Sequence, residues 1–336
     1  MRIRRIVAFC LALVVLTAAS LTLAAQDKKP RKLSKQEQQD VATLVKLADA
    51  VAAGQPAPAE FKLTWVQNHF AKSADGTTFV PFTLSVDRAA LGSPAVTMHV
   101  RAIRKNAAPV EPKKDDEKKV EYPWDDVQFF DVPADGRISR ALAVPAGDYD
   151  LLVAIKEKST GKRNEVKKTA AVRHDLSVPD FSKPELSTSS IIIAETVEPS
   201  PMLDAEKQRE NPYTFGTMRV IPALEPKIAK ASELQVVFWI YGVTPAAMQK
   251  PDVQLEYNFH QKLPEGEKYF NKTAPQILNV GSLPPEFDLS VGHLLMGTLS
   301  VPVASFPTGD YRLEIKITDK PSGKAVTRDV NFSVIG

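Results

Sequence analysis

The sequence has a single cysteine, Cys10, and this residue lies inside an apolar run without charge from Ile6 to Ala25. The run follows a short basic leader, Met1 to Arg5, which predicts a secretory signal peptide over residues 1–25. Small residues at Ala24 and Ala25 favour cleavage there, whereas an uncleaved membrane anchor, for which about 20 apolar residues suffice, is the alternative. Without the leader the chain has no thiol, so disulfides and cysteine chemistry are excluded.

The sequence also lacks an excess of charge of either sign. Of its 43 basic residues, Arg2, Arg4 and Arg5 belong to the leader, which leaves 40 basic residues against 40 acidic ones. A neutral chain offers no electrostatic footprint for nucleic acid or for an anionic bilayer. We therefore expect no nucleic-acid partner, and contact with a membrane only through an uncleaved leader.

Motifs that carry catalysis or bind metal are missing as well. The chain has no G-x-S-x-G, H-E-x-x-H, P-loop or G-x-G-x-x-G pattern. Its five histidines stand singly, without metal-ligand spacing: His69, His99, His174, His260 and His293. Asp125, Asp126, Asp131 and Asp135 lack the alternating register of a calcium loop. We expect no catalytic residue, no metal and no cofactor, and therefore not an enzyme.

What the sequence does contain is an internal duplication. Val144–Lys162 aligns without a gap on Phe306–Lys324 at a spacing of 162 residues, and both segments carry a Gly-Asp-Tyr triplet followed by alternating apolar residues. The alternation predicts a half-buried strand. Tyr149 and Tyr311 then resemble the tyrosine corner of immunoglobulin-like sandwiches, an ordinary core tyrosine being the alternative. A phase slip near Thr327 predicts a β-bulge in the return strand.

A second pair of segments repeats in the same order. Val80–Lys105 aligns on Val237–Lys262 at a spacing of 157 residues, so the second copy requires a five-residue insertion, placed near Pro302–Phe306. Within this block, Trp239 is expected to be the core tryptophan of its sandwich. Phe238 and Ile240 lie on the opposite face of the same strand and are candidates for a partner interface.

The duplication and the strand pattern predict an all-β chain of two tandem immunoglobulin-like antiparallel β-sandwiches, over residues 60–178 and 179–336. Residues 26–59 form a spacer and one short amphipathic helix, which begins at Ser34 with the Ser34/Glu37 capping-box spacing. The helix either docks on the first sandwich or pairs with a partner. The charged stretch Val110–Glu121 is interpreted as a solvated loop.

Seven strands are expected in the first sandwich. They are Phe61–Phe70, Thr77–Val86, Ala95–Arg104, Val127–Val132, Arg137–Val144, Tyr149–Lys156 and Glu165–Val172. In the second copy, Pro199–Gly216 is a long loop rich in proline and asparagine. Loops of this length are often functional, so it is the first choice for a recognition loop, with Tyr213 and Phe215 as its contact residues.

The stretch FPTGDYRLEIKITDKPSGKAVTRDVNFSV, Phe306 to Val334, resembles the carboxy-terminal sandwich of bacterial exported proteins with von Willebrand A-related or GWxTD-type domains. The D-x-S-x-S and G-W-x-T-D motifs of those proteins are absent here. The resemblance therefore implies an immunoglobulin-like fold and an envelope location, and it carries no active residue across.

These observations lead to one functional expectation and two alternatives. The chain is expected to be a non-enzymatic periplasmic or secreted protein that binds or scaffolds a protein partner of the cell envelope. A carbohydrate-binding protein using Tyr213, Phe215 or Tyr269 is the main alternative. A hydrolase is the third, and it would need two carboxyl groups about 5 to 9 Å apart in one pocket.

Overall fold

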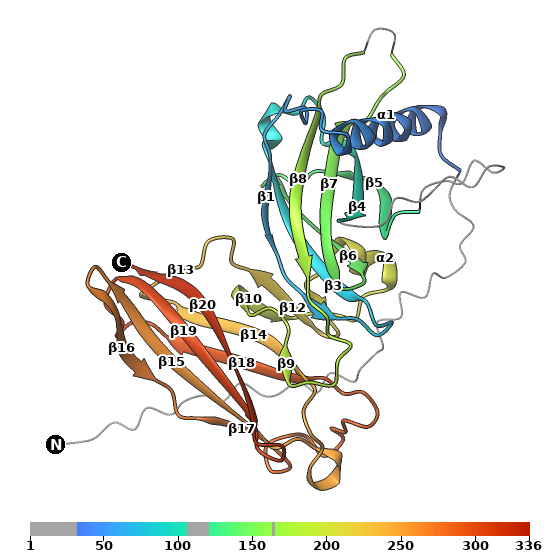
Figure 1. Cartoon of the computed structure of the whole chain (residues 1–336). Helices are drawn as coiled ribbons and strands as arrows, with labels where there is room; N and C mark the ends of the chain where they lie inside the picture. The colour runs from blue at the N-terminus through green and yellow to red at the C-terminus, as the bar shows by residue number, and fades with distance from the viewer. Residues whose placement is uncertain (1–31, 106–120, 163–164) are drawn as a thin grey trace. The chain divides into compact units, whose positions relative to one another are not determined.

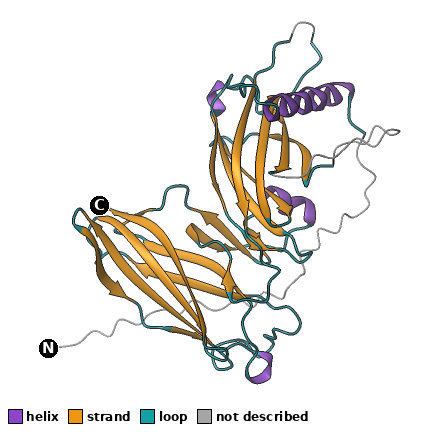
Figure 2. Cartoon of the chain, viewed as in Figure 1, coloured by secondary structure: helices purple, strands orange, loops and turns teal. Residues whose placement is uncertain are grey.

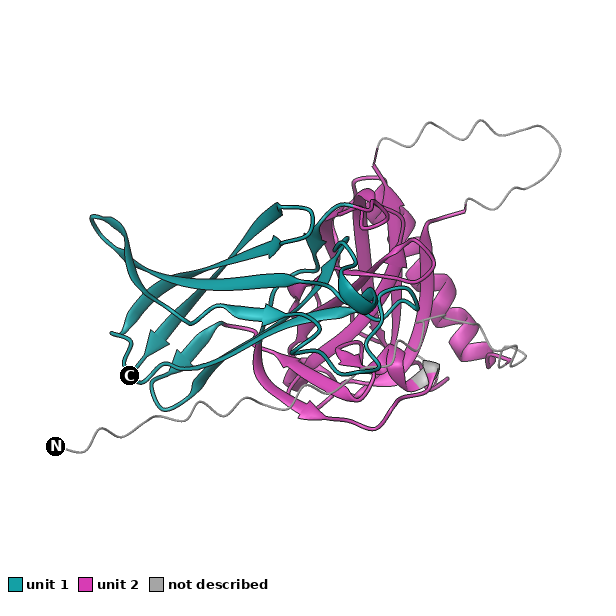
Figure 3. Cartoon of the chain, turned by 90° about the horizontal axis from the view of Figure 1, so that it is seen from below, with its two compact units in different colours: residues 1–19, 185–193, 226–336 teal, residues 20–184, 194–225 magenta. Residues whose placement is uncertain are grey.

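The structure is a computed structural model that describes residues 32–105, 121–162 and 165–336. The expected signal peptide and most of the charged stretch Val110–Glu121 lie outside the described residues. The chain divides into an N-terminal unit, which ends at residue 184 and also includes residues 194–225, and a C-terminal unit of residues 185–193 and 226–336 (Figure 3).

The N-terminal unit is a sandwich of two antiparallel sheets (Figures 1 and 2). One sheet comprises β1 (Leu63–Asn68), β2 (Ala71–Lys72), β3 (Thr78–Val86) and β6 (Arg137–Val144). The other has the order β5 (Trp124–Asp131), β4 (Ala95–Arg104), β7 (Gly147–Glu157), β8 (Thr169–Val178). The chain thus crosses between the two sheets after β3, after β5 and after β6, as in immunoglobulin-like folds. Their inward residues, including Phe82, Met98 and Tyr149, form one apolar core.

Helix α1 (Lys35–Ala52) packs on the outer face of the β4–β7 sheet (Figure 1). It begins as predicted: the Ser34 side chain accepts from the Glu37 N–H, and the Glu37 carboxylate accepts from the Ser34 N–H. Ala48 and Val51 contact Leu152 of β7, with Ile103 of β4 alongside. The helix therefore docks within its own chain, because its apolar stripe meets an apolar strip on this sheet.

The segment predicted to be a recognition loop is folded. It contains α2 (Ala205–Glu210), capped by Asp204, and a small antiparallel ribbon of β11 (Thr214–Phe215), β12 (Met218–Pro222) and the end of β10 (Ile192–Pro199). α2 contacts β6 of the N-terminal sandwich. These residues therefore form regular secondary structure rather than the irregular recognition loop that was expected.

The C-terminal unit repeats the same sandwich. β9 (Ser187–Thr188), β14 (Glu233–Tyr241) and β18 (Leu295–Pro302) belong to one sheet. The other sheet has the order β13 (Lys227–Ala229), β20 (Lys324–Ile335), β19 (Gly309–Asp319), β15 (Val253–Leu263), β16 (Gly266–Lys272), and β17 (Gln276–Leu278) also pairs with β15. The expected all-β fold of two immunoglobulin-like sandwiches is confirmed.

Two details of the C-terminal sandwich refine the prediction. The bulge expected near Thr327 is absent, since β19 and β20 pair in unbroken register from Gly309–Val334 to Asp319–Lys324. The apparent phase slip arises because Arg328 takes a place on the apolar face, where its Nε donates to Thr188 Oγ1 at 2.9 Å. The insertion lies between β18 and β19, just before Phe306, which is buried.

Tyr149 and Tyr311 have the same geometry in both sandwiches. Each ring is fully buried, and each hydroxyl donates at 2.7 Å to the carbonyl four residues earlier, Pro145 O and Pro307 O. The preceding Gly147 and Gly309 have φ of 144° and 145°, which only glycine adopts readily. Both tyrosines therefore form a tyrosine corner that ties a crossing loop to the last strands.

No described helix is both long and apolar enough to cross a membrane.

Candidate functional site

Tyr213, one of the aromatic residues predicted to contact a partner, serves the fold instead. Tyr213 is only 4% exposed, and its hydroxyl lies 3.0 Å from His69 Nδ1 and 3.4 Å from Pro81 O. Burial raises the pKa of Tyr213 and lowers the pKa of His69 to about 4. The prediction for Tyr213 is wrong because this ring anchors residues 194–225 on the β1–β3 sheet. Phe215 is half-buried in the β11–β12 ribbon, opposite Met218.

Phe238 and Ile240 were expected on an interface, and this prediction is also wrong. They are 0% and 2% exposed. Phe238 lies against Gly297 of β18, where an added Cβ would come within 2.3 Å of its ring. Trp239 is buried as well, at 6% exposure. Apolar residues occupy both faces of β14, so alternation could not show which face meets solvent.

Exposed aromatic rings are scarce in the part of the chain that the structure describes. Tyr269 of β16, 53% exposed, is the aromatic residue among the large exposed hydrophobic side chains. Its ring stands edge-on to His260, with centroids 5.8 Å apart. The other exposed hydrophobic residues are aliphatic or methionine, and four of them belong to two loops at one end of the C-terminal sandwich.

These two loops join β14 to β15 (residues 242–252) and β17 to β18 (residues 279–294), and the β19–β20 turn lies at the same end, away from the chain's C-terminus (Figure 1). We call the three segments the loop end. Its exposed apolar residues are Met248, Val280, Val291 and Leu294. Loops held on a rigid sandwich are where such folds usually carry their binding residues.

Buried polar groups hold the loop end in place. Lys250, 3% exposed, donates from Nζ to Pro284 O at 2.5 Å and lies 3.4 Å from Leu283 O, which joins the two loops. Asp319 is 1% exposed and accepts from the N–H and hydroxyl of Thr244, at 3.2 and 2.7 Å. The loop backbones are therefore fixed before any partner arrives, which reduces the entropy cost of binding.

Met248 is the most prominent side chain of the loop end. It is 74% exposed, and both it and Gln249 adopt positive φ, 57° and 56°. Such backbone conformations are unfavourable for residues other than glycine by about 1–3 kcal/mol and persist only where the surroundings impose them. Here the Leu289 N–H donates to Gln249 O at 3.0 Å and the Ala246 N–H to Lys250 O at 2.7 Å. The structure thus holds an apolar side chain in solvent on a strained backbone.

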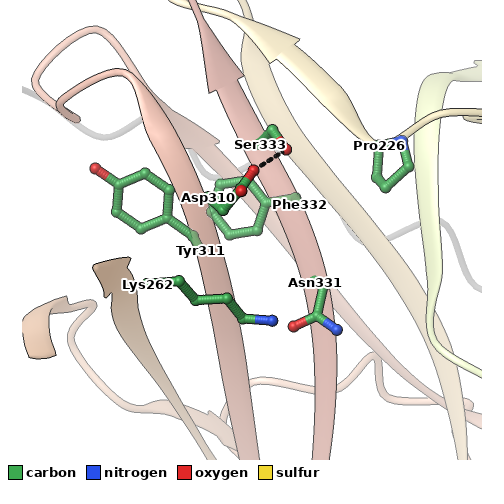
Figure 4. A pocket seen from close by; sticks show the side chains of 7 residues that line it. All are labelled: Pro226, Lys262, Asp310, Tyr311, Asn331, Phe332 and Ser333. Carbon is green, nitrogen blue, oxygen red and sulfur yellow. Dashed lines mark hydrogen bonds between the residues drawn. The ribbon is translucent and has the colours of Figure 1, made fainter. Parts of the chain in front are cut away.

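A hollow of about 150 Å³ lies elsewhere in the C-terminal sandwich, near the starts of β19 and β13 (Figure 4). Its one carboxylate, Asp310, accepts from Ser333 Oγ at 2.5 Å, and Lys262 lines the rim. A second hollow, beside Ala59 and Ala170 in the N-terminal unit, has no carboxylate among its lining residues. Neither hollow supplies the two carboxyl groups that a glycosidase requires. Among the described residues, no cluster of three or more His, Cys, Asp or Glu side chains suits a metal.

Comparison with known proteins gives structural similarity alone. No family model and no curated protein matches the sequence. The chain is similar to Salmonella alpha-2-macroglobulin reacted with methylamine (14% identity, TM-score 0.22, 82% of this chain and 16% of that one). It is also similar to Escherichia coli alpha-2-macroglobulin activated by porcine elastase (13%, TM-score 0.24, 83% and 24%) and to an immunoglobulin-like protein from Pseudomonas aeruginosa (10%, TM-score 0.21, 44% and 97%). The chain thus spans less than a quarter of the length of these two alpha-2-macroglobulins.

Proposed function

We propose that the protein is a non-enzymatic, exported binding or scaffolding protein that contacts a protein partner through the loop end of its C-terminal sandwich. The observation that carries the proposal is the placement of Met248, Val280, Val291 and Leu294, all exposed, on loops that buried polar groups hold rigid. Exposed apolar side chains cost solvation free energy, and methionine suits contact surfaces because it adapts its shape.

The character of these side chains favours protein over glycan. Sugar rings are bound by stacking on flat aromatic faces, whereas the loop end presents aliphatic and thioether groups beside polar backbone. An apolar centre with a polar rim is the anatomy of protein interfaces. Of the aromatic residues considered for glycan binding, Tyr269 is exposed, whereas Tyr213 is buried and cannot stack on a sugar.

An envelope location is part of the proposal. It is supported by the predicted signal peptide and by the resemblance of Phe306–Val334 to the carboxy-terminal sandwich of exported von Willebrand A-related and GWxTD-type proteins. The absence of thiols from the chain after residue 10 suits an oxidising compartment, where a free cysteine would react.

Site-specific crosslinking in the native envelope tests the proposal. A photoreactive amino acid at Val291 should trap one protein reproducibly. The same group at Val166, an 87% exposed valine of the N-terminal unit, is the matched control and should not trap it. Val291→Glu should weaken binding of the trapped protein by about 1–3 kcal/mol, whereas Val166→Glu should leave it unchanged.

Each other outcome contradicts part of the proposal. Equal trapping at both positions would remove the loop end as the binding surface. If no protein adduct forms at Val291 and the chain is retained on cell-wall material, the ligand is a glycan rather than a protein.

A further inference from the structure

β18 forms an open edge of its sheet, and its sequence has none of the usual protection of such edges. It pairs with β14 in unbroken register from Leu295–Ile240 to Pro302–Glu233. No described strand pairs with its other side. The strand reads LMGTLSVP, with no charged residue and with proline only at its last position. Exposed edge strands of this kind are templates for pairing with another strand.

The equivalent edge of the N-terminal sandwich is protected. β6 also pairs only with β3, but it carries Arg140, whose side chain points inward at the position opposite Phe82. Arg140 donates from Nε to Gln128 Oε1 at 2.6 Å and lies over the Phe130 ring. An inward-pointing charge on an edge strand opposes the addition of a further strand. In β18, Gly297 occupies the position opposite Phe238.

The other described edge strands of five or more residues are protected too. β1 has a bulge between Trp65 and Gln67. β5, β8 and β16 carry charges along their length. β16 has a register shift opposite Phe259 and His260 as well. β18 therefore differs from every comparable edge in the part of the chain that the structure describes.

We propose that β18 pairs antiparallel with β18 of a second copy of this chain, so that two β14–β18 sheets continue into each other across a two-fold axis. Side chains that face each other in an antiparallel pair lie on the same side of the sheet, which limits the possible registers. In the register centred on Thr298, the two Thr298 side chains meet at the axis, Gly297 faces Leu299, and Met296 faces Ser300.

Self-complementarity argues for a second copy as the occupant. Every facing pair in this register is uncharged, and threonine pairs are among the favourable cross-strand contacts. On the face that continues the core, Gly297 faces Leu299, and the Phe238 ring lies over the glycine. Leu299 and Val301 are only half-buried in the single chain, so an added strand would cover them. The proposal is independent of the loop-end function, because it uses backbone groups and a different element.

The oligomeric state of the full chain, with Cys10 replaced by Ser, tests the pairing. Sedimentation should show a dimer that dissociates on dilution. Thr298→Lys sets two ammonium groups against each other at the axis and should weaken the dimer at least about tenfold. Thr308→Lys, the same change in an exposed loop before β19, should leave it intact. A monomeric wild type, or a dimer unaffected by Thr298→Lys, would overturn the proposal.

A single-cysteine crosslink gives a second measurement that does not depend on affinity. In the same background, Thr298→Cys places two cysteines at the axis with Cα atoms about 4.5–5.5 Å apart, within the range that a disulfide spans. Mild oxidation should convert this variant to a covalent dimer much faster than Thr308→Cys. Equal rates for the two variants would show that β18 strands do not meet.

Discussion

The outer faces of the two equivalent sheets differ between the two copies of the fold. In the N-terminal sandwich, α1 covers the β4–β7 face. In the C-terminal sandwich, no described helix covers the β15–β19 face. The repeat spacings of 157 and 162 residues relate the two faces position by position, so the chemical difference can be read directly from the sequence.

The covered face combines apolar contact with ion pairs, of which Asp40–Lys156 is buried. Asp40 of α1, 1% exposed, pairs with Lys156 and also accepts from the Ser159 N–H at 2.9 Å and hydroxyl at 2.7 Å. At the other end of the helix, Arg101 bridges Asp49 at 2.6 Å and Asp125 at 3.1 Å. These pairs fix where the helix lies along the sheet, because a shift of one turn would leave charges buried and unpaired.

The uncovered face satisfies its charges within the sheet. The positions that correspond to Arg101 and Leu152 are Asn258 and Glu314, which hydrogen-bond to each other at 3.1 Å. Arg312 meets Glu267, Glu314 and Asp329 at 2.9, 3.3 and 2.5 Å. Partial burial opposes its charge, yet these carboxylates raise the pKa of Arg312 above its ordinary value. A few outward-facing positions thus differ between the sheet that carries a helix and the sheet that carries none among the described residues.

The largest expected difference between the two faces follows from breaking one ion pair on each. Asp40→Ala leaves Lys156 buried without its carboxylate and should lower the unfolding free energy of the N-terminal unit by about 3–4 kcal/mol. Glu256→Ala removes the partner of Lys316 on the uncovered face, a pair 3.6 Å apart and about a third to a half exposed. It should cost less than about 0.5 kcal/mol in the C-terminal unit.

Hydrogen exchange in urea separates the two sandwiches, because β7 and β19 report on them individually. Asp40→Asn serves as the matched control for side-chain volume and should still destabilise, since it removes the charge that neutralises Lys156. Equal small effects of Asp40→Ala and Glu256→Ala would mean that α1 contributes little to the first sandwich.

The positions of most strands of the first sandwich could be predicted because their signals are local, whereas the last, expected at Glu165–Val172, runs from Thr169 to Val178. Alternation located β3, β4 and β6 nearly to the residue, and the capping box located the start of α1. The Gly-Asp-Tyr triplets located both corners. In each case the physical cause lies within a few residues of its effect.

Contacts between distant segments could not be predicted from local pattern. Nothing near Tyr213 shows that its partner is His69, 144 residues earlier. Likewise, the alignment of the two repeats matches Trp239 with Phe82. In the structure, however, Phe238 is the buried residue that packs against the neighbouring strand β18. The exposed loop end had no sequence signal either, because Met248 and Val291 become conspicuous only once their exposure is known.

The second largest effect is expected in the pH dependence of the stability of the N-terminal unit. Burial lowers the pKa of His69 to about 4 in the folded protein, below the unfolded value near 6.5. Between these values the unfolded chain binds a proton that the folded chain does not, so stability falls as pH falls from about 6.5 to about 4. The expected loss in the N-terminal unit is about 2 kcal/mol, reduced from the full shift because His69 is partly exposed.

His69→Gln should reduce this pH dependence without abolishing it. His174, stacked on Trp65 in the same unit with centroids 4.2 Å apart, also has its pKa lowered by burial, and it retains its share. Urea unfolding at pH 7 and at pH 4.5, followed by exchange of β3 amides, measures the slope. An unchanged slope in His69→Gln would assign the acid sensitivity to other groups.

The smallest expected difference concerns the tyrosine corners, which are the most similar parts of the two copies. Tyr311→Phe removes one hydrogen bond to Pro307 O and should cost about 1 kcal/mol. Tyr149→Phe should cost about 2 kcal/mol, because the Tyr149 hydroxyl also accepts from Arg104 Nη2 at 3.0 Å.

A double-mutant cycle between Arg104→Ala and Tyr149→Phe isolates that extra contact. A coupling of about 1 kcal/mol would account for the difference between the corners. With no coupling, the two tyrosines should cost the same. The stability contribution of the corner would then depend on the repeated Gly-Asp-Tyr triplet alone and not on the neighbouring residues, which differ between the two copies.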